Sequence, residues 1–334
     1  MNLNHSQAYV DGVLAGDRRV LAKTITLVES NRTEHQALAA EIIDALLPHT
    51  GKATRLGITG VPGVGKSTFI EAFGIMLAER GHRLAVLAVD PSSTRSGGSI
   101  MADKTRMERL SVHPGAFIRP SPSGGCLGGV ARKTRETLLV CEAAGFDVII
   151  VETVGVGQSE TTVASMVDFF LVLMLAGAGD ELQGIKKGVL ELADALAVNK
   201  ADGDNVEKAA HAKRQYAAAL HLLSPASSAW SPPVLTCSAL ENTGLEAIWE
   251  TVGRHREALT ITGEFNDKRR KQAMDWLWAL IEEGLRFRFR SHTGVQLRLP
   301  EMLRNVEAGS VSPTVAATEL LAMLDHQSGV SSPA

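Results

Sequence analysis

The sequence predicts an α/β fold in which helices cover both faces of a mostly parallel central sheet. Short apolar runs alternate with helix-like segments from about residue 54 to residue 260, and this alternation indicates such a sheet. Polar, chemically distinctive segments begin where several of these runs end, and ligands in such folds bind beyond the carboxyl ends of the strands. The predicted strands are 56–59, 84–89, 116–118, 147–151, 169–175, 195–198 and 234–236.

The first 50 residues are predicted to form an N-terminal helical segment that packs on the sheet domain. Thr33-Glu34-His35-Gln36 has the pattern of a capping box and is expected to open a helix with Thr33 as its N-cap. No residue pattern typical of catalysis occurs in this segment. An earlier set of side chains shares one helical face: Val20, Leu21, Thr24, Leu27 and Val28.

Residues 263–327 are predicted to form a C-terminal helical extension, followed by a disordered tail at 328–334. Ser312-Pro313 is expected to start its last helix. An apolar, tryptophan-bearing stripe on an appendage favours a homodimer surface, although the extension could instead fold back on its own core. The stripe consists of Met274, Leu277, Trp278, Ile281 and Leu285.

The composition indicates neither a nucleic-acid partner nor a membrane partner. The 334 residues carry a net charge of −3, with a pI near 6.4, which gives no electrostatic case for nucleic acid. The three cysteines form no C-x-x-C pair, which favours reduced thiols. The longest apolar run, 169–176, is far shorter than a membrane span, and the polar start resembles no targeting segment. We therefore expect a cytoplasmic protein without a membrane or nucleic-acid partner.

A glycine-rich stretch after the first predicted strand indicates a phosphate-binding loop. It fits the pattern G-x-x-x-x-G-K-[ST] and lies between a strand-like run and a helix-like run. Its glycines let backbone N–H groups turn toward phosphate oxygens, Lys66 would reach the β- and γ-phosphates, and Ser67 would bind Mg²⁺. Residues 51–262 are therefore predicted to be a P-loop NTPase domain. The predicted phosphate-binding residues are Gly60, Val61, Pro62, Gly63, Val64, Gly65, Lys66, Ser67 and Thr68.

A second motif predicts that the nucleotide is GTP rather than ATP. Asn199-Lys200-Ala201-Asp202 follows the run 195–198, and the Asp202 carboxylate can accept hydrogen bonds from guanine N1–H and its 2-amino group. The Lys200 stem can lie over the base, and Asn199 can tie this loop to the phosphate loop. Downstream, Ser238-Ala239 could offer a backbone N–H to guanine O6.

Two carboxylates end predicted strands on the side of the phosphate loop. Asp90 follows 84–89 and Glu152 follows 147–151, where carboxylates can hold Mg²⁺ or its waters against the phosphates. Gly155 would let a backbone N–H approach the γ-phosphate, so 152–155 is predicted to be a switch element. In-line attack by water is expected to be slow in the protein alone, because no water-positioning group is evident.

Two further polar segments, 91–107 and 176–187, are predicted to be loops that become ordered with GTP, with ordinary flexible loops as the alternative. The first contains Asp103 and Arg106. The second contains a dense polar set that includes Asp180 and Glu181.

Together the segments G-I-T-G-V-P-G-V-G-K-S-T, V-D-P-S-S, V-E-T-V-G-V-G-Q-S-E and N-K-A-D resemble the MeaB/ArgK GTPases, relatives of the methylmalonic aciduria type A protein. The resemblance covers roughly 50–300. It implies a homodimeric chaperone that binds adenosylcobalamin-dependent methylmalonyl-CoA mutase, gates cofactor loading by GTP hydrolysis and protects the mutase from inactivation. It also implies slow GTPase activity that the mutase stimulates.

By the same resemblance, Asp103 joins Ser67, Asp90 and Glu152 near Mg²⁺, and the catalytic set is Lys66, Asp90, Asp103 and Glu152. Gln183 and Lys186 would sense the mutase. Ala102 stands where the family commonly has glycine, which leaves the placement of Asp103 open.

Two other functions fit the same class of fold. A GTPase that delivers nickel or zinc would usually carry a Cys/His cluster near its switches, whereas the ten histidines here are scattered. A kinase linked to arginine transport would need an acceptor pocket with a base, and the sequence shows no candidate for one.

Overall fold

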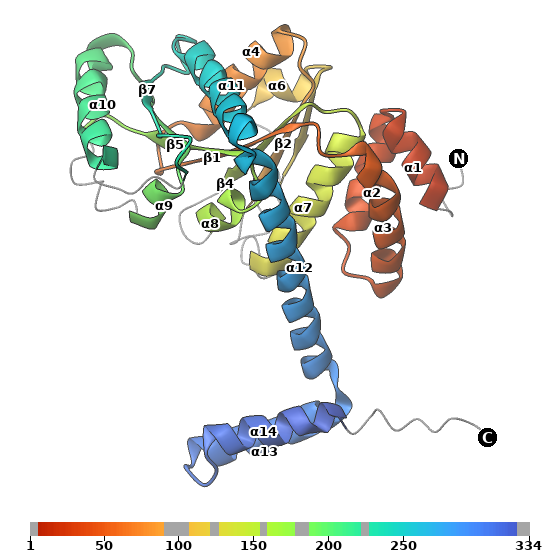
Figure 1. The fold of residues 1–334 in the computed structure, drawn as a ribbon. Helices are drawn as coiled ribbons and strands as arrows, with labels where there is room; N and C mark the ends of the chain where they lie inside the picture. The colour runs from red at the N-terminus through yellow and green to blue at the C-terminus, as the bar shows by residue number, and fades with distance from the viewer. Residues whose placement is uncertain are drawn as a thin grey trace. The chain divides into compact units, whose positions relative to one another are not determined.

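The fold is built on a seven-stranded sheet with the order β3-β2-β4-β1-β5-β6-β7, in which every pairing is parallel (Figure 1). The computed structural model describes residues 6–89, 107–120, 127–153, 159–177, 187–221 and 227–325, with the backbone alone at 33, 127, 128 and 187. Each predicted apolar run contains a strand, so the α/β prediction is confirmed. The strands are β1 (Thr54–Gly60), β2 (Leu84–Val89), β3 (Ala116–Arg119), β4 (Val148–Thr153), β5 (Phe169–Met174), β6 (Ala195–Val198) and β7 (Val234–Thr236).

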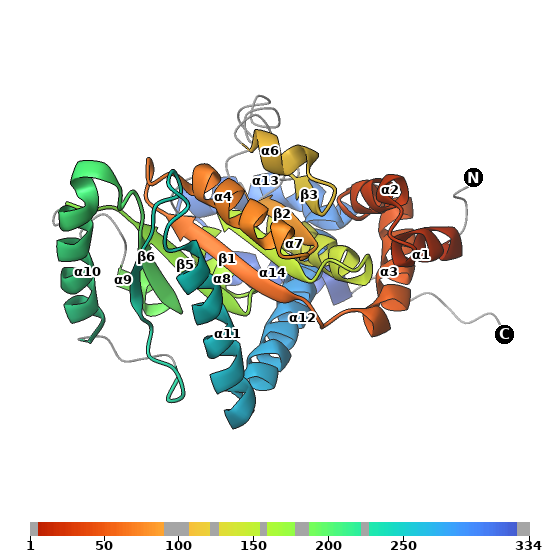
Figure 2. The same cartoon turned by 90° about the horizontal axis from the view of Figure 1, so that it is seen from above.

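Helices cover both faces of this sheet, as Figures 1 and 2 show. Strand residues alternate between two hydrophobic clusters: Val148 and Ile150 join one, and Ile149 and Val151 join the other. The first face carries α4 (Lys66–Glu79), α6 (Glu108–Val112) and α11 (Leu245–Thr262). The second carries α7 (Leu127–Ala143), α8 (Ser159–Ala164), α9 (Lys187–Glu191) and α10 (Val206–His221), the last preceded by the 3₁₀ turn η3 (Gly203–Asn205).

The N-terminal segment forms α1 (Ser6–Leu14), α2 (Arg18–Val28), α3 (Thr33–Leu46) and the 3₁₀ turn η1 (Leu47–His49). Its apolar side chains join the cluster beneath α7. The predicted capping box is wrong, because α3 begins at Thr33 itself and its N-cap is Arg32, which makes no side-chain capping bond. Instead, Ser30 Oγ accepts the Arg32 N–H at 3.3 Å and lies 2.8 Å from His35 Nδ1, so Ser30 organises the entry into the helix.

The chain divides into two compact units, 1–272 and 273–334. The helix α12 (Glu264–Ser291) begins in the first unit and continues into the second, which also holds α13 (Thr293–Glu307) and α14 (Pro313–Asp325). The second unit has a small core of its own, formed by Val295, Met302, Ala316 and Leu320. None of the helices in the described ranges combines the length and apolar character that a membrane span requires.

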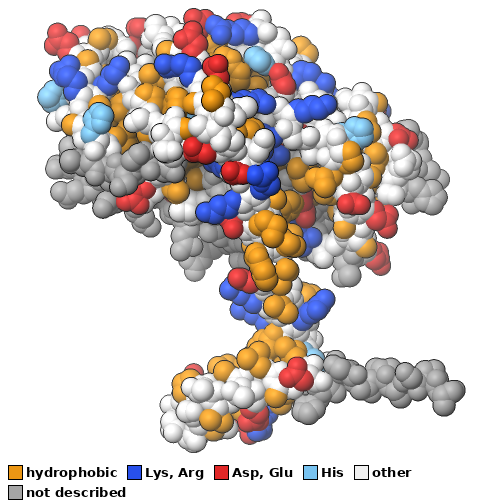
Figure 3. Space-filling view, viewed as in Figure 1, with side chains coloured by type: hydrophobic (Ala, Val, Ile, Leu, Met, Phe, Trp, Pro, Cys, Tyr) orange, Lys and Arg blue, Asp and Glu red, His pale blue; other side chains and the backbone are white. Residues whose placement is uncertain are grey.

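The predicted apolar stripe lies on α12 and is exposed in the single chain. Trp278 is 60% exposed and Leu285 57%, and Met274, Leu277 and Ile281 are exposed as well. Figure 3 shows hydrophobic side chains gathered along this helix. A cluster of this kind is unusual on a surface that faces only water.

The first turns of α12 are bound to the amino-terminal edge of the sheet. Arg269 makes a two-pronged ion pair with the buried Asp168, at 2.8 and 2.6 Å, directly before β5. Lys268 Nζ donates to the Asp168 carbonyl at 2.7 Å. Gln272 Nε2 donates to the Val167 carbonyl at 2.8 Å. These contacts fix the base of α12 at the end of the sheet opposite the phosphate loop.

Candidate nucleotide site

The phosphate loop joins β1 to α4 at the carboxyl edge of the sheet. Gly63 and Gly65 have φ angles of 78° and 86°, in the left-handed region where a side chain is strained. The helix α4 begins at Lys66 without a side-chain capping bond, so its first N–H groups face outward with no acceptor inside the helix. This arrangement suits an anion such as a phosphate group.

The amine of Lys66 is held within the loop, where Nζ donates to the Gly60 carbonyl at 2.8 Å. Burial lowers the pKa of Lys66, and the negative charges of Glu152 and then Glu160 oppose that shift. Two carboxylates therefore lie close enough to the lysine for their charges to act on it.

Glu152 lies near the carboxyl end of β4, in register with Ile58 of β1 and Ala88 of β2, and is only 4% exposed. The next residue, Thr153, shares a hydrogen bond of 2.7 Å between hydroxyls with Thr59, which directly precedes the phosphate loop. The exits of β1 and β4 are thus tied together. Carboxylate and hydroxyl oxygens are the ligands that Mg²⁺ prefers, so Glu152 and Ser67 fit this ion chemically.

The predicted base-binding loop follows β6. Lys200 adopts a positive φ of 58°, which turns the chain sharply between Asn199 and Asp202. Ser238 Oγ donates to the Asp202 carboxylate and accepts the Glu241 N–H at 3.0 Å. The carboxylate is therefore oriented by a residue from the loop after β7.

Asn199 connects three loops from a buried position. Its Nδ2 donates to the Val64 carbonyl in the phosphate loop at 2.8 Å, and its Oδ1 accepts the Ala239 N–H at 3.3 Å. The loops approach so closely that a Cβ added to Gly65 would lie 3.3 Å from Asn199 Nδ2 and 3.8 Å from Lys200 Cε. The segments 60–68, 199–202 and 238–239 therefore form one site, although up to 179 residues separate them in the sequence.

Eight of the predicted site residues lie outside the described residues: Asp90, Asp103, Arg106, Gly155, Asp180, Glu181, Gln183 and Lys186. One further residue at the site, Glu160, was not predicted from the sequence. Glu160 stands in the first turn of α8, is 7% exposed and acts electrostatically on Lys66. Its place at the end of the V-E-T-V-G-V-G-Q-S-E segment was the available signal.

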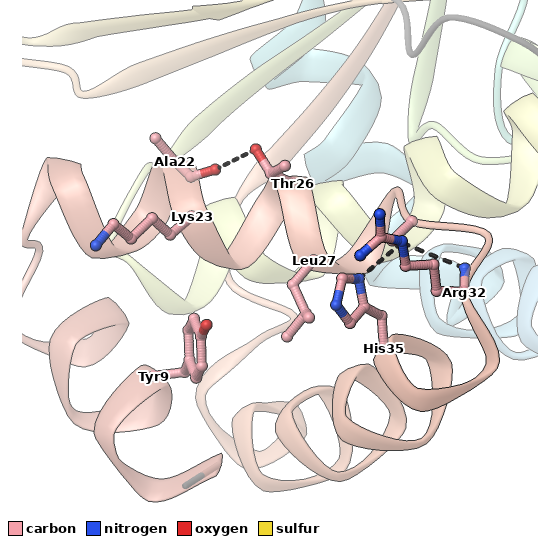
Figure 4. Close-up of a pocket in the computed structure, with 8 residues that line it drawn as sticks. Tyr9, Ala22, Lys23, Thr26, Leu27, Arg32 and His35 are labelled. Atoms are coloured by element: carbon pink, nitrogen blue, oxygen red, sulfur yellow. Dashed lines mark hydrogen bonds between the residues drawn. The ribbon is translucent and has the colours of Figure 1, made fainter. Parts of the chain in front are cut away.

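A separate cavity of about 660 Å³ lies among the N-terminal helices and shares no residue with the nucleotide site. Figure 4 shows Lys23 at one end of the lining residues and Arg32 and His35 at the other, with Tyr9 and Leu27 between them. Because the two cations lie apart, the cavity offers no single point for an anion. In the described part of the chain, no three His, Cys, Asp or Glu side chains group so as to hold a metal ion.

The fold and the phosphate loop define the chain as a P-loop nucleotide-binding protein. Residues 21–293 match the family model described as methylmalonyl Co-A mutase-associated GTPase MeaB. The chain belongs to this family and is a GTPase that binds guanine nucleotides.

Relatives from bacteria and animals agree with this placement. The chain is 56% identical over 325 residues to a probable GTPase of Mycobacterium tuberculosis, covering 96% of this chain and 97% of the relative. It is 48% identical to the GTPase ArgK of Escherichia coli over 93% of this chain and 94% of the relative. It is 45% identical to the mouse mitochondrial methylmalonic aciduria type A homolog over 94% of this chain and 79% of the relative.

A solved structure has the same fold along nearly the whole chain. It is described as a LAO/AO transport system kinase and has a TM-score of 0.78 at 41% identity. The match covers 97% of this chain and 99% of that one.

Proposed function

We propose that this GTPase is a chaperone of adenosylcobalamin-dependent methylmalonyl-CoA mutase, which gates cofactor loading and protects the mutase from inactivation. The observation that carries the proposal is the match to the mutase-associated family over 21–293, which includes the phosphate loop and the base-binding loop. The name of the mouse relative, which refers to methylmalonic aciduria, supports the same assignment.

In the proposed reaction, water attacks the γ-phosphate in line with the leaving GDP. Lys66 and the first N–H groups of α4 bind the phosphate oxygens and neutralise charge. Mg²⁺, held by Ser67 and Glu152 together with Asp90 and Asp103, would supply further charge neutralisation at the β- and γ-phosphates. Asp202 selects guanine.

We further propose that the chain acts as a homodimer in the cytoplasm. The exposed stripe on α12, with Trp278 at 60% exposure, is the surface that supports a second copy of the chain. Sedimentation of the full chain beside a Trp278→Ser/Leu285→Ser variant tests this. A monomeric wild-type chain would refute the homodimer.

The function is tested with purified chain and purified mutase. GTP turnover should rise when the mutase is added, and a pull-down should retain both proteins. Lys66→Ala, which removes the phosphate-binding amine, is the control that should show no turnover in either condition. Unchanged turnover together with no complex would refute the chaperone function.

The description of the similar solved structure as a transport system kinase suggests one further measurement, of where the γ-phosphate goes. With labelled GTP, the γ-phosphate should appear as inorganic phosphate. Label transferred to another acceptor would favour a kinase instead.

A further inference from the structure

The helix α8 connects the nucleotide site to the rest of the second face. It has only six residues, too few for a helix to be stable without tertiary contacts. Its Val163 packs so closely on β1 that a Cβ added to Gly57 would lie 2.9 Å from Val163 Cγ1. Its first turn carries the buried Glu160.

One guanidinium holds the other end of α8. Arg135, from α7, donates from Nη2 to the Ser165 carbonyl at 2.9 Å and to Ser165 Oγ at 2.8 Å, directly after the last residue of the helix. Ser165 Oγ in turn donates to the Thr162 carbonyl at 2.7 Å. A cation at a helix C-terminus interacts favourably with the helix dipole, so Arg135 acts as the C-terminal cap of α8.

The same guanidinium also reaches α12. Arg135 Nη1 donates to the Gln272 carbonyl at 3.2 Å. The side chain of Gln272 binds the segment that follows α8 as well, because its buried Nε2 donates to the Val167 carbonyl. The turn 165–168 is therefore held by α7 and by α12 at once. Beyond Gln272, α12 continues into the second unit of the chain.

We propose that Arg135 is a positioning residue for GTP hydrolysis. It holds α8 in a fixed position relative to the phosphate loop and links α8 to the base of α12. The packing of α8 on β1, at Gly57, lies three residues before the phosphate loop, so the position of α8 bears directly on the strand from which the loop leaves. The proposal depends on GTP hydrolysis by the chain and holds whether or not the mutase is its partner. If Arg135 has this role, binding or conformational change at the C-terminal unit can alter the rate of GTP hydrolysis through α12.

The first test is GTP turnover by Arg135→Gln in the full chain without any partner. We expect kcat to fall about tenfold while KM stays within about twofold, because displacement of a supporting group misplaces the reacting atoms without removing nucleotide contacts. The matched control is Arg132→Gln, one turn earlier on α7, whose ion pair is with Glu136 of the same helix. Its kcat should equal that of the wild type.

Two related variants separate positioning from loss of folding. Arg135→Lys keeps the charge at the end of α8 but not the fork that reaches both Ser165 and Gln272, so kcat should recover in part. Ser165→Ala removes one acceptor of Arg135 and should lower kcat in the same direction, and it decides the question if Arg135→Gln does not fold. A kcat within twofold of wild type in the folded variants would overturn the proposal.

The link to α12 is tested by hydrogen exchange of residues 264–272 in the wild-type chain, with GDP and with a non-hydrolysable GTP analogue. Exchange should differ between the two nucleotides, and this difference should be lost in Arg135→Gln and retained in Arg132→Gln. A merely structural arginine would change exchange equally in both states. Identical exchange in the wild type would overturn the link.

Discussion

Replacing Asn199 by alanine should weaken both the folded state and nucleotide binding. The side chain is 1% exposed and connects the phosphate loop to both base-binding loops. Alanine removes the donor to the Val64 carbonyl and the acceptor of the Ala239 N–H, while the backbone of all three loops stays the same.

Three groups lose their partner, and two of them set the size of the effect, because the third, the Cys237 thiol, is only a weak donor to Asn199 Oδ1 at 3.6 Å. A buried polar group left without a hydrogen bond costs about 1–3 kcal/mol, and Val64 and Ala239 are both buried. Since the 3.3 Å bond is the weaker one, we expect the free energy of unfolding to fall by about 2–4 kcal/mol. GTP affinity should fall at least about tenfold, which corresponds to ~1.4 kcal/mol, because the loops are no longer held together before binding.

Urea unfolding without nucleotide measures the first effect, since bound nucleotide would itself stabilise the folded state. Calorimetric titration with GTP measures the second. Asn205→Ala is the matched control. The Asn205 side chain also donates to a backbone carbonyl, that of Lys200, but Asn205 is only half-buried. Equal effects of the two substitutions on stability and affinity would refute the role given to Asn199.

Three further predictions follow from other contacts. Asp202→Asn should reduce the preference for GTP over ATP by a few kcal/mol, on the scale of a mispaired buried polar group, as measured by competition binding; an unchanged preference would contradict base recognition by Asp202. Gly57→Ala places a Cβ 2.7 Å from Phe170 Cδ2 and should cost about 1–3 kcal/mol in urea unfolding and slow GTP turnover, whereas Gly253→Ala, with open space around it, should cost nothing. Burial raises the pKa of Asp194, but its hydrogen bond to His255 and the charge of Lys268 outweigh burial and hold the pKa below its ordinary value. The ionised form therefore stabilises the fold above the pKa of an ordinary aspartate, and this contribution should be lost as the pH falls through the lowered pKa in a pH series of unfolding free energies; an Asp194→Asn variant with the same acid dependence as wild type would argue against it.

Much of the fold could be predicted because local signals and burial agree. The runs 84–89 and 195–198 are apolar throughout, and they form β2 and β6, which are buried along their whole length and have a neighbouring strand on each side. The capping box failed because α3 begins one residue earlier than the pattern implies: Arg32 is the N-cap, and its carbonyl accepts the Gln36 N–H at 3.0 Å. A local motif does not fix the first residue of a helix that closely.

Contacts between distant residues were not predictable in the same way. Arg135 and Gln272 are 137 residues apart, and Arg269 and Asp168 are 101 apart. In the sequence each is an ordinary charged or polar residue of a helix or loop. Only the packing of α7 and α8 on the second face of the sheet, with the first turns of α12 bound before β5, gives these side chains their partners.

The amino-acid sequence alone determined the chemistry of the site, because a phosphate loop and a guanine-binding loop each consist of consecutive residues whose spacing carries the function. It also determined the parallel sheet, through continuous apolar runs. The tertiary structure decided how the loops are joined by Asn199 and how α8 is held by Arg135. Such contacts depend on distances between separate segments, which hydrophobic packing of the whole core sets and no local pattern encodes.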